Sequence, residues 1–242
     1  MFTKLHKTSH GATVLNEKPL HAALQEWYAQ PNDRFEVSLG GFVIDIVQGD
    51  LLVEIQTRNF AAIKQKLIKL TVCHPVRLVY PIAREKWILK PSRGRHGQFS
   101  RRKSPKRGTI EDVFEELVSF PELLSNPNFS IEVLLIQEDE FRRYDSTGRW
   151  RRKGWVTYKR QLLQVMEQRL FRVPADMGAL VPSALAEPFT TSNLAIAIAK
   201  PRRLAQKMVY CLRLIGCIAP TGKRRNAILY SRESSIRLRK AS

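Results

Sequence analysis

The hydrophobic pattern changes its period along the chain, and each change predicts a new element. Apolar residues first recur at i, i+3, i+4 and i+7 after Asn16, a residue type favoured at helix N-caps, which predicts an amphipathic helix over 17–29. Residues 34–57 then alternate with a period of two. Gly40-Gly41 and Gln48-Gly49 both suit two-residue hairpin loops, so the segment predicts a three-stranded antiparallel meander.

The middle of the chain alternates between helical and strand-like periods. The predicted elements are a helix over 58–70, a buried strand over 76–82, a short helix over 110–119, a buried strand over 131–137 and a helix over 159–171. Two stretches lack periodicity: 84–108, which we expect to be a mobile loop, and 142–157, a basic and aromatic bridging segment. The predicted order is α-β-β-β-α-β with a further helix and strand, an α/β fold.

The last third of the chain predicts two helices and a hairpin. Thr191 or Ser192 can cap a short helix, and Lys200-Pro201 makes a turn into a second helix that runs to about Ile215. Short strands at 217–219 and 227–230 would then flank a basic loop over 221–226.

Basic residues are concentrated in three patches. The formal net charge is +19, and segments 84–108, 142–160 and 200–240 carry +9, +7 and +11, which leaves −8 for the rest of the chain. One patch alone is typical of a solvated surface, but three favour a polyanionic partner, since each neutralised phosphate releases counterions. An anionic membrane is the weaker alternative, because no segment joins this charge to a clear amphipathic helix.

Length and composition exclude several classes of protein. The 242 residues suit one or two domains, and no run approaches the roughly 18 apolar residues of a membrane helix. The N-terminus lacks the apolar core of a signal peptide. Three cysteines without CxxC spacing argue against a disulfide framework and favour a cytoplasmic location. No histidine or cysteine spacing predicts a zinc site.

The predicted meander gathers acidic residues on one face of the sheet. With Gln48-Gly49 as the second loop, Asp45 faces Leu52 and lies diagonal to Glu54, while Glu36 faces Asp45 across the first hairpin. Like charges placed together repel, whereas a divalent cation binds them favourably, so these acids predict a metal site that Glu36 could support. The alternative is that this face is simply exposed to solvent.

The acids also carry a family resemblance. Asp45 stands nine residues before Glu54-Ile55-Gln56 within VIDIVQGDLLVEIQT, and the segment over about 14–138 resembles the PD-(D/E)XK nuclease superfamily. The resemblance implies a restriction-endonuclease-like αβββαβ core, with Asp45 and Glu54 binding Mg²⁺, for which Mn²⁺ is a possible substitute. It also implies that Glu17 matches an acid that some branches use, and that a homodimer is possible.

Gln56 departs from the family pattern. It stands where a lysine normally orients the attacking water, and glutamine can hydrogen-bond that water but brings no charge. Some active members carry glutamine there. A cation could instead come from the following helix, where Arg58 and Lys64 are the candidates.

The region over about 175–232 resembles a winged helix-turn-helix. This resemblance implies that the second helix enters the DNA major groove and that the basic wing contacts phosphates. Winged helices also serve as protein-docking modules, but the basic residues at the helix start and in the wing favour DNA. The predicted division is a nuclease-like domain over 1–141, a bridging segment over 142–174 and a winged-helix domain over 175–242.

The predicted DNA contacts come from three places. They are Arg93, Arg95, Arg101, Arg102, Lys103, Lys106 and Arg107 in the basic loop, Arg202, Arg203, Gln206 and Lys207 on the second helix, and Lys223, Arg224 and Arg225 in the wing. The catalytic candidates are Asp45, Glu54 and Gln56, with Glu17 and Glu36 as further acids.

The sequence thus predicts a metal-dependent DNA endonuclease targeted by a winged helix. Two alternatives stay open. A non-catalytic DNA-binding regulator or accessory subunit would explain Gln56. An RNA-binding factor is less favoured, because no RNP-like aromatic strand or GXXG loop is visible.

Overall fold

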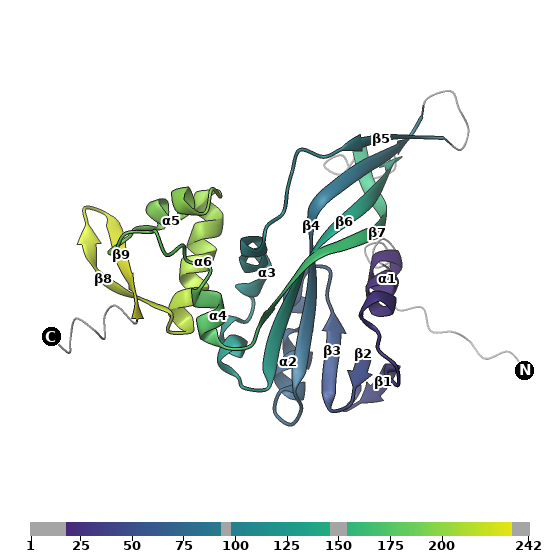
Figure 1. Ribbon diagram of the computed structural model, residues 1–242, viewed down its shortest axis with the longest axis horizontal. Coiled ribbons are helices and arrows are strands. Elements are labelled where there is room, and N and C mark those ends of the chain that lie inside the picture. Colours follow the sequence, from purple (N-terminus) through teal and green to yellow (C-terminus); the bar gives the residue numbers. More distant parts are fainter. Residues whose placement is uncertain (1–17, 93–97, 146–153, 234–242) are drawn as a thin grey trace, which may run out of the picture. The chain divides into compact units, whose positions relative to one another are not determined.

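The computed structural model describes residues 18–92, 98–145 and 154–233 (Figure 1). The described residues form a mixed α/β fold with a seven-stranded sheet and a separate two-stranded sheet. The large sheet has the strand order β1-β2-β3-β4-β6-β7, with β5 paired to β4. Its first strands are antiparallel, and β3 and β4 are parallel. The predicted α/β class is therefore confirmed.

The elements have the following bounds. The strands are β1 Arg34–Leu39, β2 Phe42–Gln48, β3 Leu51–Ile55, β4 Val76–Pro91, β5 Phe99–Lys103, β6 Phe129–Asp145, β7 Gly154–Phe171, β8 Ile218–Arg224 and β9 Ala227–Arg232. The α-helices are α1 Lys18–Tyr28, α2 Lys64–Leu70, α3 Phe114–Leu117, α4 Pro174–Gly178, α5 Thr191–Ala197 and α6 Arg202–Leu214. Short 3-10 helices are η2 Phe60–Ile63, η3 Ile110–Val113 and η4 Pro121–Ser125.

The chain divides into two compact units, each built from separate segments. Unit 1 comprises 1–29, 83–108 and 135–167, and unit 2 comprises 30–82, 109–134 and 168–242. Unit 1 therefore contains α1, β5, the later parts of β4 and β6, and most of β7. Unit 2 contains the meander, α2 and all elements from α4 onward.

The first hairpin of the meander has the predicted register, and the second does not. Leu39 pairs with Phe42 and Val37 with Ile44, as expected for a Gly40-Gly41 loop. The second loop is Gly49-Asp50, because Gln48 pairs with Leu51. Gly49 takes the left-handed φ of 58° at the first loop position, where a two-residue hairpin favours glycine. The predicted Gln48-Gly49 loop was wrong by one residue.

The meander also differs from the expectation of one buried, apolar face. Ile44 and Ile46 are buried as predicted, but Val47 and Leu52 on the opposite face are buried too. Phe35, predicted to lie in the core, is 48% exposed on the edge strand β1. Both faces of β3 and of the later part of β2 are therefore covered, whereas Val43 at the start of β2 is 55% exposed and β1 remains at the surface.

Three predictions for the middle of the chain were wrong. The expected mobile loop over 84–108 contains the end of β4 and the whole of β5. The bridging segment over 142–157 contains the end of β6 and the start of β7. The helix predicted over 159–171 is part of β7, because pairing in the sheet outweighs the helix-like spacing of its leucines.

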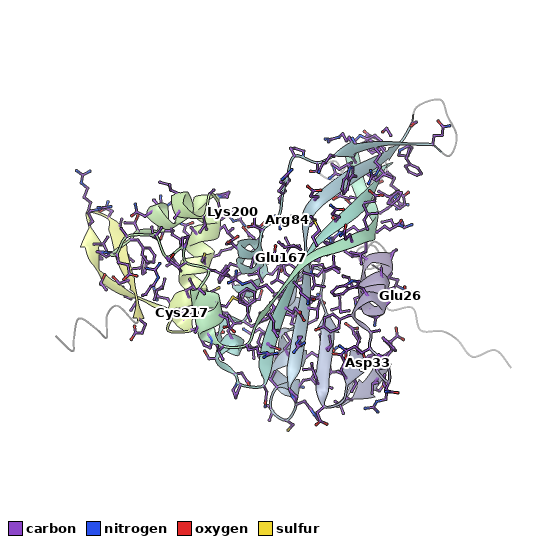
Figure 2. All side chains as sticks on the ribbon, in the orientation of Figure 1. Glu26, Asp33, Arg84, Glu167, Lys200 and Cys217 are labelled. Carbon is purple, nitrogen blue, oxygen red and sulfur yellow. The ribbon has the colours of Figure 1, made fainter. Side chains whose placement is uncertain are left out.

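Polar side chains link the strands of unit 1. Arg84 donates a 2.9 Å hydrogen bond to Glu167, and Figure 2 shows these two side chains close together. In the same unit, Lys86 lies 2.7 Å from Glu140. Arg160 donates two hydrogen bonds, of 2.9 and 2.7 Å, to the fully buried Glu138. These contacts explain how so polar a sequence forms long strands.

In unit 2, aromatic packing fixes the turn that follows β3. Phe60 in η2 stacks on Phe120 with ring centroids 5.4 Å apart, and Tyr80 of β4 meets Phe60 edge to face at 4.8 Å. Phe120 in turn contacts Phe129 at 6.0 Å. α2 follows directly after η2, so these ring contacts hold the N-terminal end of α2 in place.

The C-terminal segment forms the two expected helices and a longer hairpin than expected. Thr190, one residue before the predicted caps, is the N-cap of α5, and its Oγ1 accepts a 3.2 Å hydrogen bond from the Asn193 amide. β8 and β9 pair as far as Arg224 and Ala227, so the turn is Arg225-Asn226 and the predicted loop over 221–226 was too long. Arg225 has a left-handed φ of 55°.

Candidate functional site

Two acidic side chains meet on adjacent strands of the meander. The pairs Ile46–Val53 and Val47–Leu52 set the register, and extending it by one residue brings Asp45 opposite Glu54. Asp45 also binds the next residue of β3, since its Oδ2 accepts a 2.7 Å hydrogen bond from the Ile55 amide. The corrected loop thus brings the two predicted metal ligands closer together than the predicted diagonal arrangement.

Glu54 is buried, with 5% of its surface exposed. Burial, and next the negative charge of Asp45, raise the pKa of Glu54 from 4.5 to about 7, although Lys66 acts in the opposite direction. Burial therefore outweighs the ion pair. A carboxylate in this setting lowers the stability of the fold when it ionises, which favours binding of an additional positive charge.

Lys66 supplies the positive charge next to Glu54. Its Nζ lies 2.5 Å from Glu54 Oε1 and donates a 2.5 Å hydrogen bond to the Val43 carbonyl. These contacts bring α2 against the ends of β2 and β3. Only 15% of the Lys66 side chain is exposed, so the ammonium lies within the site and not in bulk solvent.

The sequence reasoning missed Lys66 and named Arg58 and Lys64 instead. One signal was present: Lys66 lies three residues after Ile63 and four before Leu70, both on the predicted inner stripe of the helix. A lysine at that position borders the buried face and can extend along it. The structure brings a cation from this helix next to Glu54, and that cation is Lys66.

Gln56 holds the turn that leads away from the two acids. Its backbone amide donates to Val79 at 3.0 Å. Its side-chain Nε2 donates to the Arg58 carbonyl at 2.5 Å and, more weakly, to the Asn59 carbonyl at 3.4 Å. Gln56 therefore lies beside the site but its amide nitrogen is engaged by the backbone.

The first of the two supporting acids, Glu36, lies on the edge strand β1 beside the pair. Phe35 pairs with Ile46 and Val37 with Ile44, so the register puts Glu36 opposite Asp45 as predicted, but Glu36 is exposed and has a left-handed φ of 49°. Across the described ranges, no group of three or more histidine, cysteine, aspartate or glutamate side chains could hold a metal. Glu17 lies outside the described residues.

Three of the basic residues predicted in the first patch, Arg101, Arg102 and Lys103, lie on β5. Arg101 forms an ion pair with Asp139 at 2.9 Å, and Lys103 forms one with Glu85 at 2.9 Å, with Arg107 at 3.7 Å from the same glutamate. Arg102 and Lys106 are exposed. Arg93 and Arg95 lie outside the described residues.

The C-terminal helix α6 presents a basic face to solvent. Arg202, Arg203 and Gln206 are exposed at its N-terminal end, and Lys223, Arg224 and Arg225 are exposed on the hairpin. Lys207 differs, because it forms a 2.5 Å ion pair with Glu115 of α3 and donates to the Glu115 carbonyl. The opposite side of α6 carries the predicted inner residues Leu204, Met208, Cys211 and Leu212, all buried.

Two further contacts join the C-terminal segment to the rest of unit 2. Lys200 donates to both oxygens of Asp112 at 2.8 and 3.0 Å, and Figure 2 labels this lysine at the turn between α5 and α6. Glu116, next to the partner of Lys207, accepts a 3.1 Å hydrogen bond from the Phe60 amide. α3 thus contacts both α6 and the turn that follows Gln56.

Comparison with known proteins shows the family. Residues 18–172 match the family model described as "Domain of unknown function (DUF8091)", which covers well over half of the chain. The chain belongs to the DUF8091 family. It is also 31% identical over 222 residues to an uncharacterized protein of Treponema pallidum (strain Nichols), a match that spans 90% of this chain and 86% of that protein. No solved structure matches the DUF8091 chain significantly.

The match to the family model includes Asp45, Glu54 and Lys66 but ends before α4. The similarity to the Treponema protein is longer and extends over most of the chain. Within the described ranges, every helix is too short or too polar to span a membrane.

Proposed function

We propose that this DUF8091 protein is a metal-dependent endonuclease that hydrolyses phosphodiester bonds of DNA. The observation that carries the proposal is the juxtaposition of Asp45 and Glu54 with Lys66 at the end of a hairpin. A buried carboxylate facing a second one weakens the fold, so stability gives no reason for the arrangement. The resemblance of the Asp45 to Gln56 segment to PD-(D/E)XK nucleases supports the same reading.

The donor set fits a hard divalent cation. Asp45 and Glu54 offer carboxylate oxygens, and Mg²⁺ commonly uses one or two carboxylates with phosphate oxygens and water as its other ligands. The raised pKa of Glu54 is consistent with a site that lacks one positive charge. When bound, Mg²⁺ would polarise the scissile phosphate and make the attacking water more acidic; Mn²⁺ would substitute for it.

In the family pattern one lysine both orients the attacking water and brings a positive charge. Here Lys66 and Gln56 share these two roles. Lys66 brings the ammonium, which can stabilise charge on the phosphate or on the attacking water, from α2 instead of β3. Gln56 keeps the backbone turn in place through Nε2 and can hydrogen-bond water through its amide oxygen. Attack by that water on phosphorus forms one P–O bond as the P–O bond to the leaving oxygen breaks.

The C-terminal segment supplies the proposed DNA-targeting surface, a winged helix. α5 and α6 form the helical pair, and β8 and β9 form the wing. Arg202 and Arg203 are exposed at the start of α6, where a helix that enters a groove first meets phosphates. The ion pair between Lys207 and Glu115 removes Lys207 from this surface in the DNA-free protein.

One observation favours a second candidate, a non-catalytic DNA-binding protein with a degenerate nuclease fold. The Nε2 group of Gln56 hydrogen-bonds two backbone carbonyls, a role that stabilises a turn and needs no chemistry. In that case Lys66 would simply neutralise Glu54.

Incubation with supercoiled plasmid and with branched oligonucleotide DNA separates the two candidates. The endonuclease should cut with Mg²⁺ or Mn²⁺ and stop in EDTA. Binding of the same DNA with no cutting under any metal condition would reject the endonuclease in favour of the regulator. No DNA binding at all would reject both.

A further inference from the structure

One surface of unit 1 carries four aromatic rings, one from each of four strands. We call them the aromatic row: Trp87 of β4, Phe99 of β5, Phe141 of β6 and Tyr158 of β7. The centroid of Phe141 lies 5.6 Å from that of Phe99 and 6.3 Å from that of Tyr158. β4 and β5 pair Trp87 with Lys103 and Pro91 with Phe99, which puts Trp87 and Phe99 on the same face.

Positively charged side chains lie over three of these rings. The guanidinium of Arg101 is 4.5 Å from the centroid of Trp87, and the ammonium of Lys103 is 5.2 Å from it. Lys159 lies 5.0 Å from the centroid of Phe141 and Arg143 lies 5.9 Å from that of Tyr158. The row therefore alternates apolar rings with cationic groups.

The net charge of this surface is positive. Its carboxylates are Asp139, paired with Arg101, and Glu85, paired with Lys103 and Arg107. Among the described residues, two acids thus face five bases, namely Arg101, Lys103, Arg107, Arg143 and Lys159.

Part of the same surface is open to solvent, although Trp87, Phe141 and Tyr158 are half-buried. The side chains of Arg101, Lys103 and Arg107 are 44%, 46% and 68% exposed, and Phe99 is 41% exposed. Exposed ion pairs contribute little to stability, and an exposed phenylalanine gains little from folding. The composition of the row is therefore better explained by a ligand than by the fold.

The ligand must combine flat apolar groups with negative charge. Unpaired bases offer faces that stack on aromatic side chains, and the phosphates that join them bind lysine and arginine. Base pairs within a duplex expose no such faces along their length, and an acidic peptide would use the cations but not the rings.

We propose that the aromatic row binds single-stranded DNA, with bases stacked on the rings and phosphates held by the surrounding cations. The choice of DNA over RNA rests on the proposed function. The inference deepens that function by naming its substrate class, DNA that carries an unpaired segment, such as a flap, gap or branch.

Binding of a labelled dT16 oligonucleotide tests the proposal when it is measured in EDTA, so that a failure of cleavage chemistry leaves the result intact. Phe99→Ala should weaken dT16 binding about fivefold or more, and leave binding of a 16-base-pair duplex unchanged, since stacking of one base contributes about 1 kcal/mol or more. Phe35→Ala is the matched control, because Phe35 is 48% exposed on another short strand, in unit 2. Equal effects of the two variants, or no effect of Phe99→Ala, would overturn the proposal.

Photo-cross-linking gives a second readout that does not depend on a variant. An oligonucleotide with 5-iodouracil should cross-link to Phe99, Phe141, Tyr158 or Trp87, with the attached peptide identified by mass spectrometry. Cross-links confined to α6 would overturn the assignment of the surface. Tighter binding of rU16 than of dT16 would overturn the assignment to DNA.

Discussion

The ammonium of Lys66 lies 2.5 Å from Oε1 of Glu54, across the gap between α2 and β3. The two residues come from different elements, and the sequence motif contains only one of them. The E-x-Q motif contains no lysine, and Lys66 adds an ammonium group to a site that otherwise contains two carboxylates and a side-chain amide. The proposed chemistry therefore depends on Lys66 as much as on the residues that carry the family resemblance.

Lys66→Met should reduce DNA cleavage about 100-fold or more, because it removes the ammonium from the site at nearly constant side-chain length. Lys64→Met, on the same helix, is the control and should retain full activity. Single-turnover cleavage rates under saturating Mg²⁺ make the comparison. Adding Gln56→Lys to the Lys66→Met protein should restore part of the rate, since it returns an ammonium to the neighbouring strand position. Equal rates for Lys66→Met and the parent protein would show that Lys66 takes no part in the mechanism.

Mg²⁺ should stabilise the protein through Asp45 and Glu54. At a concentration about tenfold above the dissociation constant, binding contributes about 1.4 kcal/mol, which raises the melting temperature by about 3–5 °C for a chain of this size. Glu54→Gln should lose this shift, because it removes a ligand carboxylate. Melting curves with Mg²⁺, and with NaCl at matched ionic strength, make the measurement. A Mg²⁺ shift of the same size in both proteins would place the metal elsewhere.

Glu140 should make stability depend on acid pH. Burial alone disfavours its charge, but hydrogen bonds and charges from Lys86, with Arg142 and Thr157, outweigh burial and lower its pKa from 4.5 to about 2. Because the folded pKa is below the unfolded one, the stabilisation is present above pH 4.5 and disappears as the pH falls toward 2. Glu140→Gln should therefore cost about 2–3 kcal/mol at pH 7, and the difference from the parent should shrink below pH 4.5.

Glu167→Gln is the matched control for that experiment. Its ion pair with Arg84 is 46% exposed on both sides, and exposed pairs contribute about 0–1 kcal/mol. Urea denaturation at pH 3 to 8 provides the free energies of unfolding. A loss at Glu140→Gln that stays constant down to pH 3 would show that its charge is not the cause.

Arg202→Ala combined with Arg203→Ala should weaken duplex binding and flatten its dependence on salt. Each phosphate contact contributes about 0.9 to the slope of log K against log salt, so the slope should fall by about 2. Arg34→Ala with Lys69→Ala removes two exposed charges elsewhere in unit 2 and should leave the slope unchanged. An unchanged slope in the Arg202 and Arg203 variant would indicate a protein-docking role for the proposed winged helix.

The elements with strong local signals could be predicted from the sequence. The helix at α1 and the hairpin that pairs Val37 with Ile44 follow from periodicity and a Gly-Gly loop. The second hairpin was shifted because Gly49 fits either the first or the second loop position. Only tertiary packing decides between them.

The long strands of unit 1 could not be predicted because non-local contacts stabilise them. Residues 99–103, FSRRK, resemble a solvated loop, yet Arg101 and Lys103 are satisfied by carboxylates and Trp87 on neighbouring strands. In β7, Leu162 and Met166 happen to have helical spacing. The strand forms because it pairs along its length with β6, the preceding strand of the sheet.

The sequence pointed to the two acids of the candidate site but not to its lysine. Asp45 and Glu54 can be singled out because both lie in the short segment that carries the family resemblance. Lys66 belongs to no motif, and its side chain reaches Glu54 only after α2 has folded back onto the meander. A one-dimensional pattern does not contain that distance. The aromatic row was missed for the same reason, because its rings come from four separate strands.

The most direct test of the account compares Asp45→Asn with Asp50→Asn in Mg²⁺-dependent cleavage of branched DNA. Both variants remove one carboxylate from the same hairpin, but Asp50 is exposed in the loop whereas Asp45 faces Glu54. We expect Asp45→Asn to abolish cleavage while its DNA affinity stays within a few-fold of the parent, and we expect Asp50→Asn to cut normally. Equal cleavage by the parent and by Asp45→Asn would contradict the account.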